Sequence, residues 1–293
     1  MNKTIKILTA FLFSVQISCN NSNTSNAPAS AEKIKIENEG VNIVYNNTKI
    51  GDTTLLFVHG CGINKSYRTN QVDYFSKENR VVTLDLPGFG ESGKNRSSWT
   101  VDDYSKDIST VLTKLDLKNV ILIGHSMSRA IVLETALTNP SRIIGVVGAD
   151  NFKTFGVVET LQSKEQTANV YKEIRANFKA TVSDYANQAM FSPSTDSAIR
   201  KRVLHDLTSG DTIIATNCME QGDKYRTDAK LLSYKKPLYL INSDFIPNDT
   251  AALKKNNIEY YLFNIGTTGH YPMIEKPDDF NALLQQAIEK MKQ

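Results

Sequence analysis

The sequence is poor in the residues that build metal centres and redox sites. It has three cysteines and four histidines among 293 residues. These side chains do not occur at the spacings typical of a zinc site, and no glycine-rich loop of the phosphate-binding kind is present. We therefore expect no metal and no organic cofactor.

An excess of charge of one sign is also missing. The 34 Lys and Arg residues nearly balance the 31 Asp and Glu residues, for a net charge of +3. Since no basic block occurs, we expect no nucleic-acid partner. After the first residues, no apolar run reaches the roughly 20 residues needed to span a bilayer. The length and the 40% hydrophobic content suit one large α/β domain, or one domain with an insertion.

The first 33 residues differ in composition from the rest. Residues 1–18 carry two lysines and then the apolar run ILTAFLFSVQIS, the layout of a secretory signal peptide. Cys19 closes the run and resembles the lipidated cysteine of bacterial lipoproteins, although Gln16 departs from their pattern. Residues 19–33 predict a flexible polar tether. We expect an exported protein with a lipid anchor at Cys19, its only membrane contact. The alternative is an ordinary signal peptide and a periplasmic or secreted protein.

Strand and helix signals alternate over residues 34–151 and again over 237–293. Residues 34–47 predict a hairpin that turns near Glu39 and Gly40, and further runs predict strands near 54–60, 80–92, 119–124, 142–150, 236–244 and 259–265. Helical periodicity occurs at 100–117, 129–140 and 277–293, with Thr100 as the first N-cap. This order predicts a mostly parallel sheet with helices on both faces. Residues 152–236 are polar and helical, and predict an inserted helical cap.

One short motif carries the chemistry. Gly124-His125-Ser126-Met127-Ser128 joins a buried strand directly to a helix, which is the setting of a G-x-S-x-G nucleophile elbow. A serine on such a strained turn projects its hydroxyl above the sheet edge, and the N–H of Met127 faces a developing oxyanion. Two residues depart from the usual motif, since Ser128 replaces a glycine and Arg129 a small residue. We interpret Ser126 as a nucleophile, against the alternative of a chance serine in a tight turn.

A serine nucleophile needs a general base, and the sequence offers four histidines. His59 and His125 adjoin buried strands and are interpreted as structural, while His205 lies in the inserted segment. His270 lies in a glycine-rich loop between the last strand and the last helix. Because catalytic groups belong on loops at the carboxyl edge of a parallel sheet, we predict His270 as the base.

The stretches FVHGCG (57–62), LDLPGFGES (84–92), GHSMS (124–128) and GTTGHYPMIEKP (266–277) occur in a characteristic order. Their order and spacing resemble those of the α/β-hydrolase superfamily. The resemblance covers about residues 40–293 and is greatest to the esterase and haloperoxidase-like branch with a helical cap. It implies an α/β-hydrolase fold, but no substrate, because this superfamily hosts many reactions.

The resemblance also implies roles for further residues. The backbone N–H of Cys61 becomes the second oxyanion donor beside Met127, without use of its thiol. Asp85 becomes a structural acceptor in a turn. The acid that orients His270 comes from the end of the sixth or the seventh strand, so Asp150 and Asp244 are both candidates. We favour Asp150, which ends its strand cleanly, and keep Asp244 as the alternate acid.

These assignments predict a serine hydrolase that cleaves an ester or related acyl bond of a small apolar molecule. A C–C hydrolase or a cofactor-free peroxidase-like enzyme on the same fold is one alternative. A small-ligand binding protein with residual hydrolysis, suggested by Ser128 and Arg129, is another. Apolar cap residues are expected to line the pocket or to pack as plain core: Tyr171, Phe178, Tyr185, Met190, Phe191 and Met219.

Overall fold

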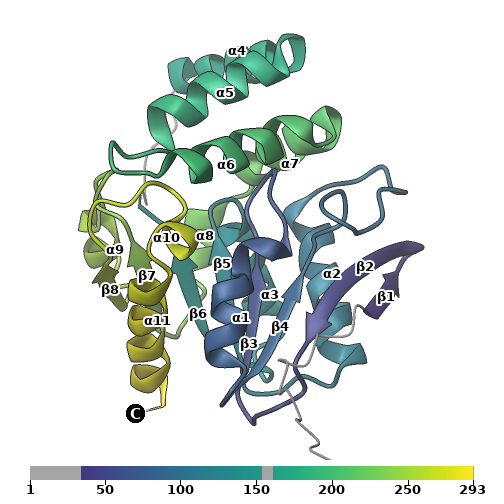
Figure 1. Cartoon of the computed structure of the whole chain (residues 1–293), viewed down its shortest axis with the longest axis vertical. Helices are drawn as coiled ribbons and strands as arrows, with labels where there is room; N and C mark the ends of the chain where they lie inside the picture. The colour runs from purple at the N-terminus through teal and green to yellow at the C-terminus, as the bar shows by residue number, and fades with distance from the viewer. Residues whose placement is uncertain (1–33, 154–160, 293) are drawn as a thin grey trace, which may run out of the picture. The chain divides into compact units, whose positions relative to one another are not determined.

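A computed structural model describes residues 34–153 and 161–292 (Figure 1). The predicted signal peptide 1–18 and tether 19–33, with Cys19, lie outside the described residues. The described residues belong to one compact unit. No helix among the described residues has both the length and the apolar character needed to cross a membrane.

The described residues build one eight-stranded sheet in the order β1-β2-β4-β3-β5-β6-β7-β8. Only β2 runs against the others, so the expected mostly parallel sheet is confirmed. The β1–β2 hairpin turns at Glu39 and Gly40, both with positive φ, as a tight two-residue turn requires. The strands are β1 (Ile34–Asn38), β2 (Val41–Asn47), β3 (Thr54–Val58), β4 (Arg80–Leu84), β5 (Val120–His125), β6 (Ile143–Ala149), β7 (Leu238–Asn242) and β8 (Tyr260–Asn264).

Helices cover both faces of this sheet (Figure 1). The sheet needs cover on both faces because both faces of its strands are apolar. Along β5, successive side chains point to opposite faces: Leu122 belongs to one apolar cluster, and Ile121 and Ile123 belong to the other. The first cluster packs against α2 (Val101–Lys114), α3 (Ser128–Thr138), α8 (Thr227–Leu231) and α9 (Ala251–Lys255), and the second against α1 (Thr69–Phe75) and α11 (Pro277–Met291). At the start of α2, Thr100 and Asp103 form a capping box, as the sequence predicts.

Between β6 and β7 the chain forms a stack of helices above the carboxyl edge of the sheet (Figure 1). These are α4 (Leu161–Ala176), α5 (Phe178–Ala189), α6 (Ser197–Ser209) and α7 (Thr212–Lys224). Their buried apolar cluster comprises Tyr171, Ile174, Phe178 and Ala215, with Cys61 and Met219 packed against it. The inserted cap of the predicted fold class is therefore present, and it covers the loop that carries Cys61.

Tyr185 corrects one expectation about the cap. Its side chain is 60% exposed and does not line an interior surface. Phe191 is buried, but it belongs to the core cluster on the α11 face of the sheet. Helical periodicity marks an apolar stripe without specifying which partner covers it, so these two residues could not be separated from Tyr171 and Phe178 in advance.

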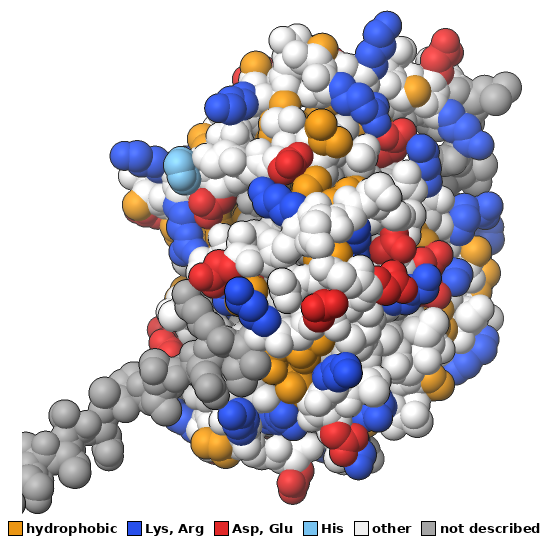
Figure 2. Space-filling model, turned by 90° about the vertical axis from the view of Figure 1, so that its right-hand side faces the viewer, with side chains coloured by type: hydrophobic (Ala, Val, Ile, Leu, Met, Phe, Trp, Pro, Cys, Tyr) orange, Lys and Arg blue, Asp and Glu red, His pale blue; other side chains and the backbone are white. Residues whose placement is uncertain are grey.

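Several short helices carry too little periodicity to be predicted. They are the 3-10 helix η1 (Lys65–Arg68), α1, α9 and α10 (Pro272–Glu275). On the surface shown in Figure 2, Lys and Arg side chains alternate with Asp and Glu side chains. That face has no continuous basic patch, in keeping with the balanced composition.

Candidate active site

Ser126 lies on the turn between β5 and α3 with a left-handed backbone, at φ 54°. Such a conformation costs a residue with a side chain about 1–2 kcal/mol, and the surrounding structure must impose it. The Ser126 N–H points to Ala149 O at 3.4 Å, and its carbonyl accepts from the N–H of Arg129 at 3.0 Å. The side chain is partly exposed. The turn therefore holds a strained serine at the carboxyl edge of the sheet.

The residues beside Ser126 account for the unusual motif. A Cβ atom on Gly124 would lie 2.8 Å from Val132 on α3, so the strand and helix pack this closely only with glycine there. Ser128 is fully buried, and its hydroxyl lies 3.0 Å from Val58 O and 2.9 Å from His125 O. The serine in place of glycine is thus accommodated, because its one hydroxyl proton is shared between two backbone carbonyls, and the elbow keeps its geometry.

Two backbone N–H groups flank the serine. Met127 precedes the first turn of α3, where the N–H groups of a helix are unpaired. Cys61 follows Gly60, and a Cβ on Gly60 would lie 3.1 Å from Ser126 Cβ, so the loop after β3 packs directly on the elbow. The Cys61 thiol donates to Ala215 O on α7 at 3.7 Å, and burial raises its pKa. The thiol is therefore neutral, and the backbone is the group that can serve an oxyanion.

His270 is held from three sides in the loop before α10. Its N–H donates to Met190 O at 2.7 Å, and its carbonyl lies 2.7 Å from Nε2 of His125. Glu275 accepts from the N–H of Gly269 at 2.9 Å and further fixes the loop backbone. The ring is oriented by Asp150, whose Oδ2 lies 2.6 Å from His270 Nδ1. This bond leaves Nε2 as the free ring nitrogen.

Asp150 ends β6 on a second left-handed turn, at φ 48°. Its side chain is 4% exposed and accepts three hydrogen bonds: from His270, from the backbone N–H of Ser243 at 2.9 Å, and from Lys153 Nζ at 2.7 Å. Burial alone would raise the pKa of Asp150, but the hydrogen bond and charge of His270, followed by those of Lys153, bring it down to about 2. The carboxylate is therefore ionised at neutral pH.

The alternate acid, Asp244, lies elsewhere. It is exposed, its N–H donates to Gly266 O at 3.1 Å, and its carboxylate accepts from Asn264 at 3.5 Å. The structure thus brings Asp150, and not Asp244, to His270. Within the described residues no hydrogen bond joins Ser126 to His270. His125 lies between them: it precedes Ser126 in the chain, and its ring centroid is 4.7 Å from that of His270. Catalytic hydrogen bonds are often long before a substrate is bound.

The other histidines and Asp85 have local roles. His59 is buried, and its ring nitrogens contact Gly60 O at 2.7 Å and the N–H of Leu86 at 2.9 Å. His205 is exposed on α6. Asp85 accepts from the backbone N–H groups of Lys65 and Glu91, at 2.8 and 2.9 Å. Asp85 is therefore the turn acceptor that the resemblance implies.

Three residues that contact Asp150 or the loop of His270 were not predicted from the sequence: Lys153, Glu275 and Met190. Lys153 lies three residues after Asp150, and Glu275 lies in the same motif as His270, so both are close in sequence to a candidate residue. Met190 binds the N–H of His270 through its carbonyl, which any residue type could supply, and its sulfur accepts from Tyr271. Contacts between segments distant in the chain leave no local pattern, which is why these were not found.

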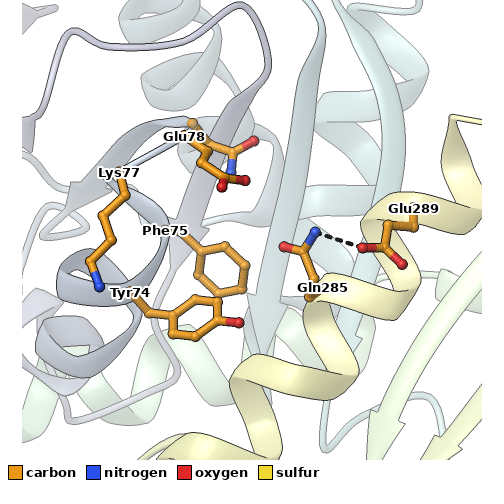
Figure 3. A pocket seen from close by; sticks show the side chains of 7 residues that line it. Tyr74, Phe75, Lys77, Glu78, Gln285 and Glu289 are labelled. Carbon is orange, nitrogen blue, oxygen red and sulfur yellow. Dashed lines mark hydrogen bonds between the residues drawn. The ribbon is translucent and has the colours of Figure 1, made fainter.

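Within residues 34–153 and 161–292, no group of three or more His, Cys, Asp or Glu side chains is arranged to hold a metal ion. A surface pocket lies between α1 and α11 (Figure 3). Its lining includes Tyr74, Asn79 and Gln285. Asn79 directly precedes β4, so this pocket lies at the amino edge of the sheet, opposite the serine.

Comparison with known proteins agrees with the fold. A family model described as the alpha/beta hydrolase fold matches residues 53–277. The dihydrolipoyllysine-residue acetyltransferase component of the acetoin cleaving system from Cupriavidus necator is 23% identical over 259 residues, which cover 85% of this chain and 67% of that protein. The match covers only 25% of the corresponding component from Pseudomonas putida.

Solved structures show the same fold. An esterase from Thermogutta terrifontis superposes with a TM-score of 0.75 at 18% identity, covering 89% of this chain and 99% of the esterase. A bromoperoxidase from Bacillus anthracis also gives 0.75, at 20% identity, covering 89% of this chain and 100% of that one. At such identities the likeness concerns the fold alone.

Proposed function

Because this chain belongs to the alpha/beta hydrolase family, we propose that it is a serine hydrolase that cleaves an ester or related acyl bond. The observation that carries the proposal is the bond of 2.6 Å between His270 Nδ1 and Asp150, combined with the strained Ser126 at the same sheet edge. An ionised acid, an oriented imidazole and an exposed hydroxyl on one edge are the parts of acyl-transfer catalysis.

In the proposed reaction, Ser126 Oγ attacks the carbonyl carbon of the substrate while His270 Nε2 takes the hydroxyl proton. The carbonyl oxygen becomes an oxyanion and accepts from the N–H groups of Cys61 and Met127. Asp150 keeps the proton on Nδ1 and stabilises the imidazolium. The imidazolium then gives its proton to the leaving alcohol as the C–O bond breaks. Water, activated by the same nitrogen, finally releases the acid and restores Ser126.

We propose a small apolar acyl group for the substrate. The cluster of Tyr171, Phe178 and Ala215 packs against Cys61, next to the proposed oxyanion donor. The hydroxyl of Tyr171 is bound to Asp223, at 2.5 Å, so the ring presents mainly apolar surface. Apolar side chains beside the acyl site favour aliphatic or aromatic acyl chains over charged ones, because burial of an unpaired charge is costly.

The proposal is tested with a fluorophosphonate probe and with p-nitrophenyl esters of two to eight acyl carbons. We expect the probe to form a covalent adduct on Ser126, mapped by peptide mass spectrometry, and the short and medium esters to be hydrolysed. Folded protein that neither reacts with the probe nor turns over any ester contradicts the proposal. An adduct on Ser126 without ester turnover retains the nucleophile but points to another bond, as in C–C hydrolases.

We further propose that the protein is exported and carries a lipid on Cys19. The support is the sequence of residues 1–19 alone, with its two lysines, apolar run and terminal cysteine. Bacteria that express the full chain with an alkyne-bearing fatty acid are expected to label the wild-type protein and not Cys19→Ala. Equal labelling of both would contradict lipidation, and a cleaved but unlabelled wild type would indicate an ordinary signal peptide.

A further inference from the structure

A lysine contacts the carboxylate that orients His270. Lys153 Nζ lies 2.7 Å from Asp150 Oδ1, 3.0 Å from Ser243 O and 3.2 Å from Ile246 O. An ammonium group has three N–H donors, and this set uses all of them. The Lys153 side chain is 11% exposed, so the cation is largely withdrawn from water.

This arrangement divides the two oxygens of Asp150 between different tasks. Oδ2 faces the imidazole of His270, while Oδ1 accepts from Lys153 and from the N–H of Ser243. The loop after β7 supplies the N–H of Ser243 and the carbonyls of Ser243 and Ile246. It therefore anchors an acid that comes from β6, although its own carboxylate, Asp244, points elsewhere.

We propose that Lys153 is a positioning residue for the proposed hydrolase, which fixes the carboxylate of Asp150 toward His270 and offsets part of its negative charge. The inference rests on the proposed function. A carboxylate with a bound ammonium stabilises an imidazolium less than a free carboxylate does, because the cation opposes a second positive charge nearby. We therefore expect loss of Lys153 to alter the pH dependence of catalysis as well as its rate.

Other groups that face the Asp150–His270 pair remain in place when Lys153 is changed. The ring of His125 lies against that of His270, and burial, then the charges of His270 and Arg68, lower its pKa well below the usual value. His125 is therefore neutral over the range where a general base titrates. The charged and titratable neighbours of the pair are His125 at the end of β5, Arg68 on η1, and Tyr271 and Glu275 at α10. Asp244 after β7 faces Asn264 and not the pair.

The test compares the pH dependence of kcat/KM for a p-nitrophenyl ester in wild type, Lys153→Met, Lys153→Gln and Lys153→Arg. Methionine and glutamine remove the charge, and arginine keeps it. We expect the acid limb to move to higher pH by about one unit in the first two variants and to stay near the wild-type position in Lys153→Arg. At pH values above the limb, Lys153→Met should also lose kcat about tenfold, with a smaller change in KM, because the acid is less firmly oriented.

Lys235→Met serves as the matched control. Lys235 is exposed, and within the described residues its ammonium group bonds the carbonyl of Leu232, at 2.8 Å, so its loss should leave the profile unchanged. Circular dichroism and thermal unfolding verify that each variant is folded. If Lys153→Met does not fold, Lys153→Gln provides the test. An unshifted acid limb in folded Lys153→Gln overturns the inference while the hydrolase stands. Absence of ester turnover in the wild type instead overturns the proposed function.

Discussion

Replacement of Ser126 by alanine is expected to lower kcat/KM for p-nitrophenyl esters by about 10⁴-fold or more and to abolish phosphonate labelling. The other hydroxyl of the elbow, on Ser128, is buried against the carbonyls of Val58 and His125, so no neighbour substitutes for Ser126. The oxyanion donors remain, and a small residual rate over water should persist. The measurement is steady-state kinetics on purified protein, with mass spectrometry of the probe-treated chain.

Ser126→Gly provides a matched control for the fold, because it removes the same hydroxyl but also the side chain that strains the turn. With φ at 54°, glycine fits the backbone better than serine or alanine. We expect Ser126→Gly to be as inactive as Ser126→Ala but to unfold with a free energy about 1 kcal/mol higher. Equal stability of the two variants would show that the turn is not strained. Retention of ester hydrolysis by Ser126→Ala would exclude Ser126 as the nucleophile.

Asp150→Asn is expected to lower kcat by roughly 10⁴-fold with a modest change in KM. The amide preserves the shape of the side chain, but it can donate to Nδ1 of His270. It then stabilises the tautomer whose proton lies on Nε2, which cannot accept from Ser126. The isosteric control is Asp244→Asn, which should change kcat by less than about twofold. Asp244 is exposed, and within the described residues its carboxylate bonds Asn264 while its N–H bonds the carbonyl of Gly266. A larger loss in Asp244→Asn than in Asp150→Asn would reverse the assignment.

Wild type and Asp150→Asn are also expected to differ in how their free energy of unfolding depends on pH. The pKa of Asp150 is about 2 in the folded protein, against an ordinary value of 3.8, so folding favours its ionised form. This stabilisation is fully present above the unfolded pKa and is lost as the pH falls through the folded one. In denaturant titrations, the stability difference between wild type and Asp150→Asn should therefore shrink between about pH 5 and pH 2. A difference that does not depend on pH would contradict the low pKa.

Residue patterns were sufficient for the fold and for most of the candidate site. Apolar runs flanked by glycine and proline placed the strands, because strands buried on both faces read as continuous Val, Ile and Leu. Ser126 was predicted because it lies directly after a strand, and His270 because it lies in the loop between the last strand and the last helix. Parallel strands bring such positions to a common edge. Asp150 was favoured for the same reason. The short helices of four to seven residues were missed because they span less than two helical turns.

The order of residues along the chain specified a parallel sheet, a serine on a tight turn and a histidine near the far end. Those features follow from local preferences, since period, turn chemistry and strand ends are all encoded within a few neighbouring positions. Three features depend on segments up to 120 residues apart: the choice between Asp150 and Asp244, the burial of Ser128 against Val58, and the contact of Lys153 with Asp150. Packing of the β7 loop against the end of β6 fixes the carboxylate of Asp150. Asp150 and Asp244 each follow a strand, so they differ in what the folded chain brings beside them.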